Sequence, residues 1–213
     1  MPASDRLGER LGTSTARLSL AVRPVDAFAG TCLRDQLTVR LSGAARPVPS
    51  PSGHFLFFDL DETKDPRTVI VTSEDRFLPT EVAVTLADLE PLSPVIEVPL
   101  TPAPAYRFPA WATLVRGRVL TAATEPVADA TITLSGLDTT GRTDDRGEFV
   151  VGLPPLDARD VVERDGRRVV VPAGDPLTVM ATHPTLDLVS ESTEVTVTEG
   201  ETVSVSLSLV KHD

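Results

Sequence analysis

The sequence has little of the residue types from which most enzyme and metal sites are built. Its 213 residues include one cysteine, Cys32, and three histidines, at positions 54, 183 and 212. One cysteine excludes an intrachain disulfide and a thiolate metal site made by this chain alone, and the histidine spacing fits no metal pattern. The sequence also lacks a Gly-x-Ser-x-Gly elbow, a Walker loop and a dinucleotide fingerprint. We therefore expect a protein that is not an enzyme and holds no metal and no cofactor.

Positive charge and long apolar runs are scarce as well. Lysine and arginine number 20 against 31 acidic residues, a net charge of −11 that repels phosphate backbones, so we expect no nucleic-acid partner. No apolar run reaches the roughly 18 residues that a membrane span needs. The first 16 residues are charged from Asp5 and lack the apolar region of a secretory signal. We expect a protein that is cytoplasmic as synthesised and that can then be part of a released extracellular particle.

The few aromatic residues are unevenly placed. Residues 101–112 contain the only tyrosine, the only tryptophan and three prolines, and their aromatic side chains are Tyr106, Phe108 and Trp111. Proline fixes its own φ and extends the residue before it, so this stretch predicts a semi-rigid linker. Two interpretations of the aromatic side chains stay open. They either pack between two domains and set the angle between them, or they form a stacking platform for a carbohydrate.

Apolar and polar residues alternate on both sides of this linker, and no segment keeps a 3.6-residue period. The alternation predicts strands at 18–22, 37–41, 54–58, 68–73, 81–86 and 95–100, a proline-punctuated edge segment at 46–53, and further strands at 114–120, 130–135, 139–143, 148–151, 176–182, 193–198 and 203–209. The expected fold is all-β, with two seven-stranded sandwiches in tandem. Its parts are a flexible arm at 1–16, a first sandwich at 17–100, the linker at 101–112 and a second sandwich at 113–210.

The two halves align as an internal repeat. The aligned pairs are 37–43 with 131–136, 53–55 with 147–149, and 68–72 with 177–181. The difference in residue number between aligned positions grows by about 15 residues from the second pair to the third. This growth predicts an insertion in the second half at 156–175. The counterpart in the first half, 61–66, is only a turn.

The insertion has the sequence of a β-hairpin. Asp165-Gly166 lies between two valine-containing runs, and this dipeptide favours a type I′ turn, which needs positive φ at both central residues. We expect a mixed-charge arm that projects at 159–171. Its candidate contact residues are Arg159, Glu163, Arg164, Arg167 and Arg168.

The second half resembles the carboxypeptidase regulatory-like domain, a seven-stranded transthyretin-like sandwich. The resemblance depends on an ordered series of short motifs. They are Val115-Arg-Gly-Arg-Val119, Pro126-Val-Ala-Asp-Ala130, Ile132-Thr-Leu134, Thr143-Asp-Asp-Arg-Gly-Glu-Phe149 and Leu153-Pro154. In the fourth motif, we expect Asp144 to accept bonds from turn amides, Gly147 to take positive φ and Phe149 to point into the core. The first half is similar to a diverged copy, with Ser50-Pro-Ser-Gly-His-Phe55 at the equivalent turn.

Domains of that family are usually non-catalytic attachments to larger proteins. The linker and the start of the second half are also similar to small accessory proteins of phage-tail-like contractile injection particles. These resemblances imply a structural or adaptor subunit that binds proteins in a larger assembly, with a homo-oligomer within the particle as one arrangement. The alternative is a carbohydrate-binding or surface-binding adhesion module that uses the aromatic side chains of the linker.

The sequence contains two acidic clusters. Asp144, Asp145 and Glu148 could supply oxygen ligands to calcium, but a turn already explains this motif, so we expect no bound metal. The residues at 59, 61, 62 and 65 form a second acidic cluster, which we expect to be a solvated loop.

Overall fold

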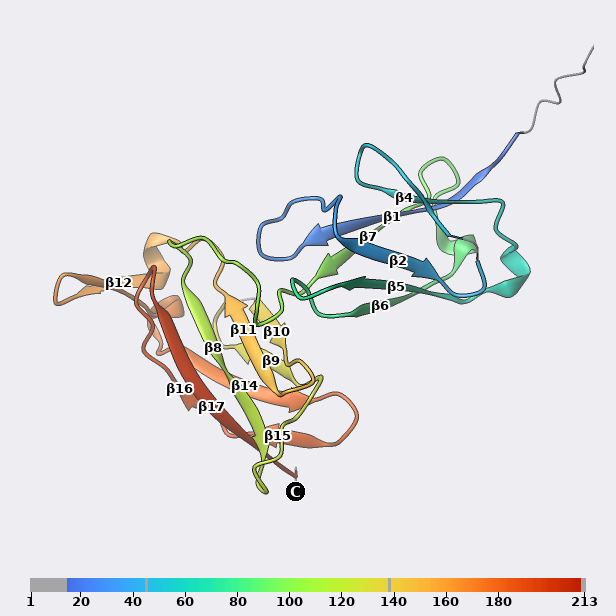
Figure 1. The fold of residues 1–213 in the computed structure, drawn as a ribbon. Helices are drawn as coiled ribbons and strands as arrows, with labels where there is room; N and C mark the ends of the chain where they lie inside the picture. The colour runs from blue at the N-terminus through green and yellow to red at the C-terminus, as the bar shows by residue number, and fades with distance from the viewer. Residues whose placement is uncertain (1–14, 45, 138, 212–213) are drawn as a thin grey trace, which may run out of the picture.

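The computed structural model describes residues 15–44, 46–137 and 139–211. Among these residues it contains β-strands and short 3-10 turns and no α-helix, which confirms the all-β class. The chain forms two sandwiches in tandem, joined by the linker (Figure 1). Most of the arm predicted at 1–16 lies outside the described residues. No helix in the described part of the chain is long and apolar enough to cross a membrane.

The first sandwich has the predicted seven strands in two layers (Figure 1). These are β1 (Leu18–Asp26), β2 (Leu37–Leu41), β3 (Val48–Pro49), β4 (Phe55–Phe58), β5 (Arg67–Ser73), β6 (Thr80–Val84) and β7 (Val95–Leu100). One sheet has the order β3-β4-β1-β7 and the other has the order β2-β5-β6. Inward residues at alternate positions, such as Leu20 and Val22 or Val69 and Val71, are fully buried between the sheets.

The second sandwich is built from ten strands. They are β8 (Leu114–Thr121), β9 (Thr131–Leu134), β10 (Thr139–Arg142), β11 (Glu148–Gly152), β12 (Val161–Arg164), β13 (Arg167–Val170), β14 (Thr178–His183), β15 (Leu188–Ser190), β16 (Thr193–Glu194) and β17 (Thr202–Lys211). Seven of them follow the order β10-β9-β14-β15-β17-β8-β11. The two ends of this order, β10 and β11, contact each other, so the sheet curves round its core. The hairpin β12-β13 and the short β16 are additions to these seven.

Strand pairing supports the internal repeat. β1 pairs in parallel with β7, as β8 does with β17. β4 is antiparallel to β1 and β11 to β8, while β2 pairs with β5 and β9 with β14. Each pair of aligned segments therefore occupies the same place in its own sandwich. One strand pairs differently in the two copies. In the second sandwich β10 pairs with β9, whereas in the first sandwich its counterpart β3 pairs with β4 and not with β2, the counterpart of β9.

Two strand predictions near chain turns were wrong in extent. The strand predicted at 193–198 is only the two-residue β16, because the backbone beyond it bonds to the hairpin, with Val170 N donating to Val197 O at 2.8 Å. β15 was not predicted. The strand predicted at 81–86 ends at Val84, because Leu86 N turns to donate to Asp65 Oδ2 at 2.7 Å.

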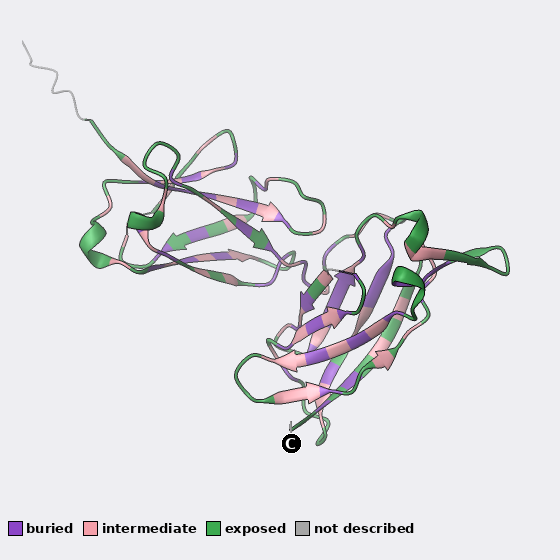
Figure 2. Ribbon diagram, turned by 180° about the vertical axis from the view of Figure 1, so that it is seen from behind, coloured by how far each residue is buried: buried purple, intermediate pink, exposed green. Residues whose placement is uncertain are grey.

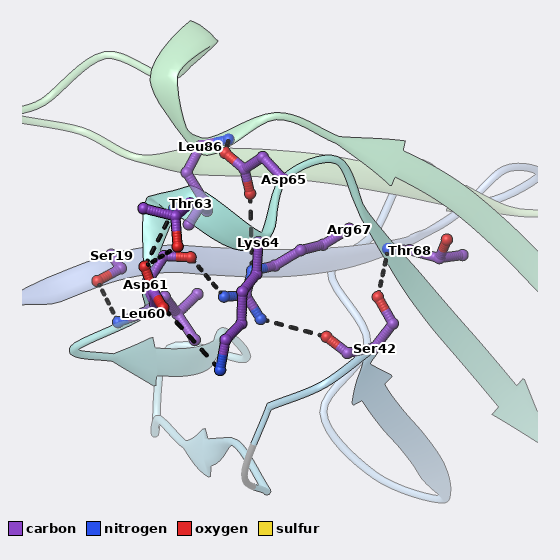
Figure 3. A network of polar contacts seen from close by, with 10 residues as sticks. All are labelled: Ser19, Ser42, Leu60, Asp61, Thr63, Lys64, Asp65, Arg67, Thr68 and Leu86. Atoms are coloured by element: carbon purple, nitrogen blue, oxygen red, sulfur yellow. Dashed lines mark hydrogen bonds and ion pairs between the residues drawn. The ribbon is translucent and has the colours of Figure 1, made fainter.

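The turn that replaces the hairpin in the first sandwich is organised by a buried arginine (Figure 3). The Arg67 side chain is 3% exposed; it donates to the carbonyl oxygens of Asp61 and Ser42 at 2.7 and 3.2 Å and lies 3.6 Å from the Asp65 carboxylate. Bonds from the Thr63 side chain and amide lower the pKa of Asp61. The expectation of a fully solvated acidic loop is therefore wrong for Asp65, which has a buried cationic partner.

The turn of the family-like motif folds as predicted. Asp144 Oδ1 accepts hydrogen bonds from the amides of Arg146 and Glu148 at 2.9 and 2.8 Å. Gly147 has φ of +70°, and a Cβ there would lie 2.6 Å from the Val119 carbonyl oxygen. Phe149 is 1% exposed in the core of the second sandwich.

Candidate functional site

The three aromatic side chains of the linker differ sharply in burial. Tyr106 is buried, Phe108 is half-buried and Trp111 is 71% exposed. They do not share one exposed face, so a three-ring platform for a carbohydrate is not formed. Only the Trp111 indole offers a large open surface.

Phe28, in the loop after β1, is the centre of the aromatic cluster. Its ring centroid lies 4.9 Å from that of Phe108 and 6.3 Å from that of Tyr106, both in edge-to-face geometry. Trp111 stacks on it at 6.3 Å with an interplanar angle of 29°. Such pairs add about 0.5–1.5 kcal/mol each beyond the buried area. The exposed indole is therefore supported from beneath by an aromatic ring of the first sandwich.

The same cluster packs against β11 of the second sandwich. A Cβ at Gly152 would lie 2.4 Å from the Phe28 ring and 3.0 Å from the Phe108 ring, so glycine makes room for both. Phe28 and Phe108 also cover Ala112, Leu114 and Val150, which form a small buried cluster of their own. Aromatic packing therefore joins the two sandwiches at the linker.

A buried polar contact holds the linker to the first sandwich. The Tyr106 hydroxyl donates to Asp26 Oδ2 at 2.6 Å, and the Asp26 side chain is itself buried. Burial, and after it this hydrogen bond, raises the pKa of Tyr106 to about 12, so the phenol stays protonated and can donate even at a pH where a free tyrosine ionises. Sequence analysis did not single out Asp26 or Phe28. The one available signal was a large aromatic residue, Phe28, among the small residues of the turn that Asp26 begins.

A cleft of about 820 Å³ lies beside the linker, between the β5–β6 loop and the β10–β11 turn. Around it, Arg116 donates to Pro104 O at 2.9 Å and the Arg142 guanidinium donates to Pro79 O. The acidic cluster considered as a calcium site, Asp144, Asp145 and Glu148, lines this cleft. Asp144 bonds turn amides and Glu148 pairs with Arg118, and no three His, Cys, Asp or Glu side chains in the described ranges gather as a metal site.

The predicted hairpin is present and its tip projects from the sandwich (Figures 1 and 2). Asp165 and Gly166 have φ of +52° and +72°, as a type I′ turn requires. Glu163, paired opposite Arg168, and Arg164, paired opposite Arg167, are exposed. Arg159, at the base, lies 3.5 Å from the Asp157 carboxylate and 4.0 Å from that of Asp160.

The projecting part is shorter than the expected 159–171. Val169, Val170 and Val171 are buried at 8%, 1% and 5% exposure, and Val170 belongs to the core of the second sandwich. Burial changes along β13: Arg167 and Arg168 at its start are exposed, whereas the valines that follow are buried on both faces of the strand. The arm that can contact a partner is therefore 162–168.

The turn at 199–201 brings the hairpin and Trp111 to one end of the second sandwich. Arg168 lies 2.6 Å from the Glu199 carboxylate and Arg167 lies 3.6 Å from that of Glu201. A Cβ at Gly200, between these two glutamates, would lie 3.8 Å from the Trp111 carbonyl oxygen. We call the surface formed by Trp111, the 199–201 turn and the 162–168 hairpin tip the docking face.

Comparison with known proteins adds little. No model of a known protein family matches the chain, and no curated protein matches it. Two of the solved structures that match are a streptococcal ancillary pilin and the shaft pilin SpaA of Lactobacillus rhamnosus GG. The first is 13% identical over 91% of this chain and 62% of its own, with a TM-score of 0.29. The second is 7% identical over 93% and 99%, with a TM-score of 0.28. The chain thus spans less than two thirds of the ancillary pilin, and TM-scores this low support no argument.

Proposed function

We propose that this protein is a non-catalytic structural or adaptor subunit that binds a protein partner through the docking face. The observation that carries the proposal is the 71% exposed Trp111, supported by Phe28 and set beside a projecting, arginine-containing hairpin. Tryptophan and arginine are the residues most enriched among interface hot spots, and a tryptophan that is already held in place loses little entropy on binding.

The assembly that we propose is a phage-tail-like contractile injection particle. The support for this choice is the resemblance of the linker and the start of the second sandwich to accessory proteins of such particles. Two sandwiches joined by aromatic packing make a spacer of defined angle, which suits a component that positions one partner relative to another. A subunit of this kind is made in the cytoplasm and leaves the cell with the particle.

A carbohydrate-binding role is the second candidate, and one observation favours it. The Trp111 indole is exposed with one side stacked on Phe28, so its other face is open to a sugar ring. Because Tyr106 and Phe108 are packed inward, Trp111 would have to act without them. Glycan-array binding that Trp111→Ala abolishes would favour this role over the adaptor role.

The adaptor role can be tested with the native protein in its source cells. We expect cross-linking and size-exclusion chromatography to place the tagged protein in a complex far above its 22.7 kDa mass, with particle proteins identified by mass spectrometry. Trp111→Ala should release it from the complex. Leu92→Ala is the matched control, since Leu92 is 94% exposed but lies on the first sandwich, away from the docking face. A protein that stays monomeric with its genomic neighbours expressed would contradict the proposal.

A further inference from the structure

The outer edge of β2 is an unpaired strand edge. Among the described residues, β2 pairs only with β5. Ser42 N donates to Thr68 O at 2.9 Å, so the backbone groups of Ser42 point towards β5. In an antiparallel pair the backbone groups of every second residue point the same way, so those of Arg40 and Thr38 also face β5. The backbone N–H groups of Leu37, Val39 and Leu41 therefore point away from β5, to the open side. This edge can accept one more strand.

The second sandwich shows what fills the equivalent edge. β9 is the counterpart of β2, and its outer edge is paired in antiparallel register with β10, from Thr139 opposite Leu134 to Arg142 opposite Thr131. The same fold, repeated within one chain, thus has an extended strand at this position in one copy and none in the other.

Prolines explain why the first sandwich does not fill its own edge. Pro47, Pro49 and Pro51 occupy alternate positions in the segment equivalent to β10, and a strand needs an N–H at alternate positions to pair along one edge. Ser50 N, between two of them, donates to His54 O at 2.7 Å, so this segment lies against β4. The β3 edge is thereby blunted against pairing, whereas β2 contains no proline or bulge.

A groove of about 640 Å³ runs between the β2 edge and β3. Apolar side chains line it, among them Val39, Leu41 and Phe55. Two exposed arginines, Arg40 and Arg46, also line it, and within the described ranges neither takes part in an ion pair. In a chain of net charge −11, a groove with both polar and apolar lining that is flanked by unpaired positive charge is complementary to an acidic ligand.

We propose that the β2 edge is a second protein-binding site, which takes up an extended, acidic segment of a partner as an added strand. The partner's backbone pairs with the outward N–H groups of Leu37, Val39 and Leu41 and with the carbonyls of Leu37 and Val39, since the Leu41 carbonyl already accepts from Ala44 N at 3.2 Å. The partner's apolar side chains enter the groove, and its carboxylates meet Arg40 and Arg46. This site is on the first sandwich and does not depend on the docking face.

The test uses a synthetic peptide in which valine and glutamate alternate, titrated into the ¹⁵N-labelled full-length protein. We expect shifts and slowed hydrogen exchange at the amides of Leu37, Val39 and Leu41. The double variant Arg40→Glu/Arg46→Glu should weaken binding roughly tenfold or more, because two exposed ion pairs are lost. The matched control, Arg146→Glu, changes an exposed arginine on the second sandwich and should leave binding unchanged.

A second peptide, N-methylated at alternate residues, separates strand pairing from simple charge attraction, because it cannot form the ladder and should not bind. The proposal is overturned if this peptide binds as well as the first, or if shifts avoid the three β2 amides. It is also overturned if the charge-reversed protein binds equally, or if the free protein already protects these amides as a dimer, since the occupant is then a second copy. Trp111→Ala should change none of these results. The proposal of the β2 site and that of the docking face can therefore be contradicted independently of each other.

Discussion

The Tyr106 hydroxyl and the Asp26 carboxylate form a buried hydrogen bond of 2.6 Å between residues 80 positions apart. The second carboxylate oxygen of Asp26 accepts hydrogen bonds from the backbone amides of Phe28 and Ala29, each at 2.9 Å. One carboxylate therefore holds both the linker and the turn that presents Phe28 to the second sandwich. This relationship makes the linker a structured joint and places Trp111 where it is exposed.

Tyr106→Phe should lower the free energy of unfolding by about 1–3 kcal/mol, because it leaves a buried carboxylate oxygen without its donor. Denaturant titration of the full chain measures this, and small-angle scattering should show a wider range of angles between the sandwiches. Trp111→Phe is the control and should change stability little, since the side chain is exposed. An unchanged unfolding midpoint for Tyr106→Phe would show that the bond does not stabilise the joint.

The same bond predicts a dependence of stability on pH at the alkaline end. The pKa of Tyr106 rises from 10 to about 12 on folding, so the folded state retains a proton that the unfolded state releases. The resulting stability is fully present below pH 10 and is lost as the pH rises towards about 12. Unfolding curves of the wild type and Tyr106→Phe should therefore converge across this window. Parallel curves from pH 9 upward would contradict the shift.

Gly117→Ala should disrupt the second sandwich severely. A Cβ there would lie 2.0 Å from the Val205 carbonyl oxygen and 2.8 Å from the Phe149 ring, so β8 and β17 would have to separate. The expected cost exceeds the roughly 1–3 kcal/mol of ordinary overpacking because the clash is with backbone. Gly166→Ala, at the hairpin turn with nothing within 4 Å, should cost only about 1–2 kcal/mol for its positive φ. Thermal unfolding of both variants compares them directly.

Removing the hairpin tip should leave the fold intact. Deleting the four residues Glu163, Arg164, Arg167 and Arg168 joins the paired Val162 and Val169 through the Asp165-Gly166 turn. We expect a near-native circular dichroism spectrum and weaker partner association. Val170→Asp, two residues beyond the last deleted residue, should instead unfold the second sandwich, because it buries an unpaired charge at a position of 1% exposure. If the deletion also unfolds the protein, the tip contributes to the core.

The division into independent domains stays a prediction. Each sandwich has a core cluster of its own, so residues 113–213 expressed alone should unfold cooperatively. The fragment should be less stable than within the full chain, because Leu114 and Val150 lose their cover of Phe28 and Phe108. A fragment without a cooperative transition would mean that the two sandwiches fold only together.

Several features followed from local sequence rules. Period-two alternation located most strands, Asp165-Gly166 identified the hairpin, and the motif from Thr143 to Phe149 identified a turn whose bonds the structure contains. The predictions failed where long-range bonds decide a strand's length: β16 is cut short by bonds to β13, and β6 by Asp65. Alternation over two or three residues was too weak to reveal β15.

The sequence by itself determined the β class, the repeat and the positions of the tight turns, because alternation and positive φ are properties of neighbouring residues. Only the tertiary structure decided that Trp111 is exposed while Tyr106 and Phe108 are packed inward, and that the β2 edge is open while the β9 edge is covered. Burial and strand pairing depend on partners far along the chain, such as Asp26 for Tyr106. Three aromatic residues within a six-residue stretch carry no local sign of which will find such a partner.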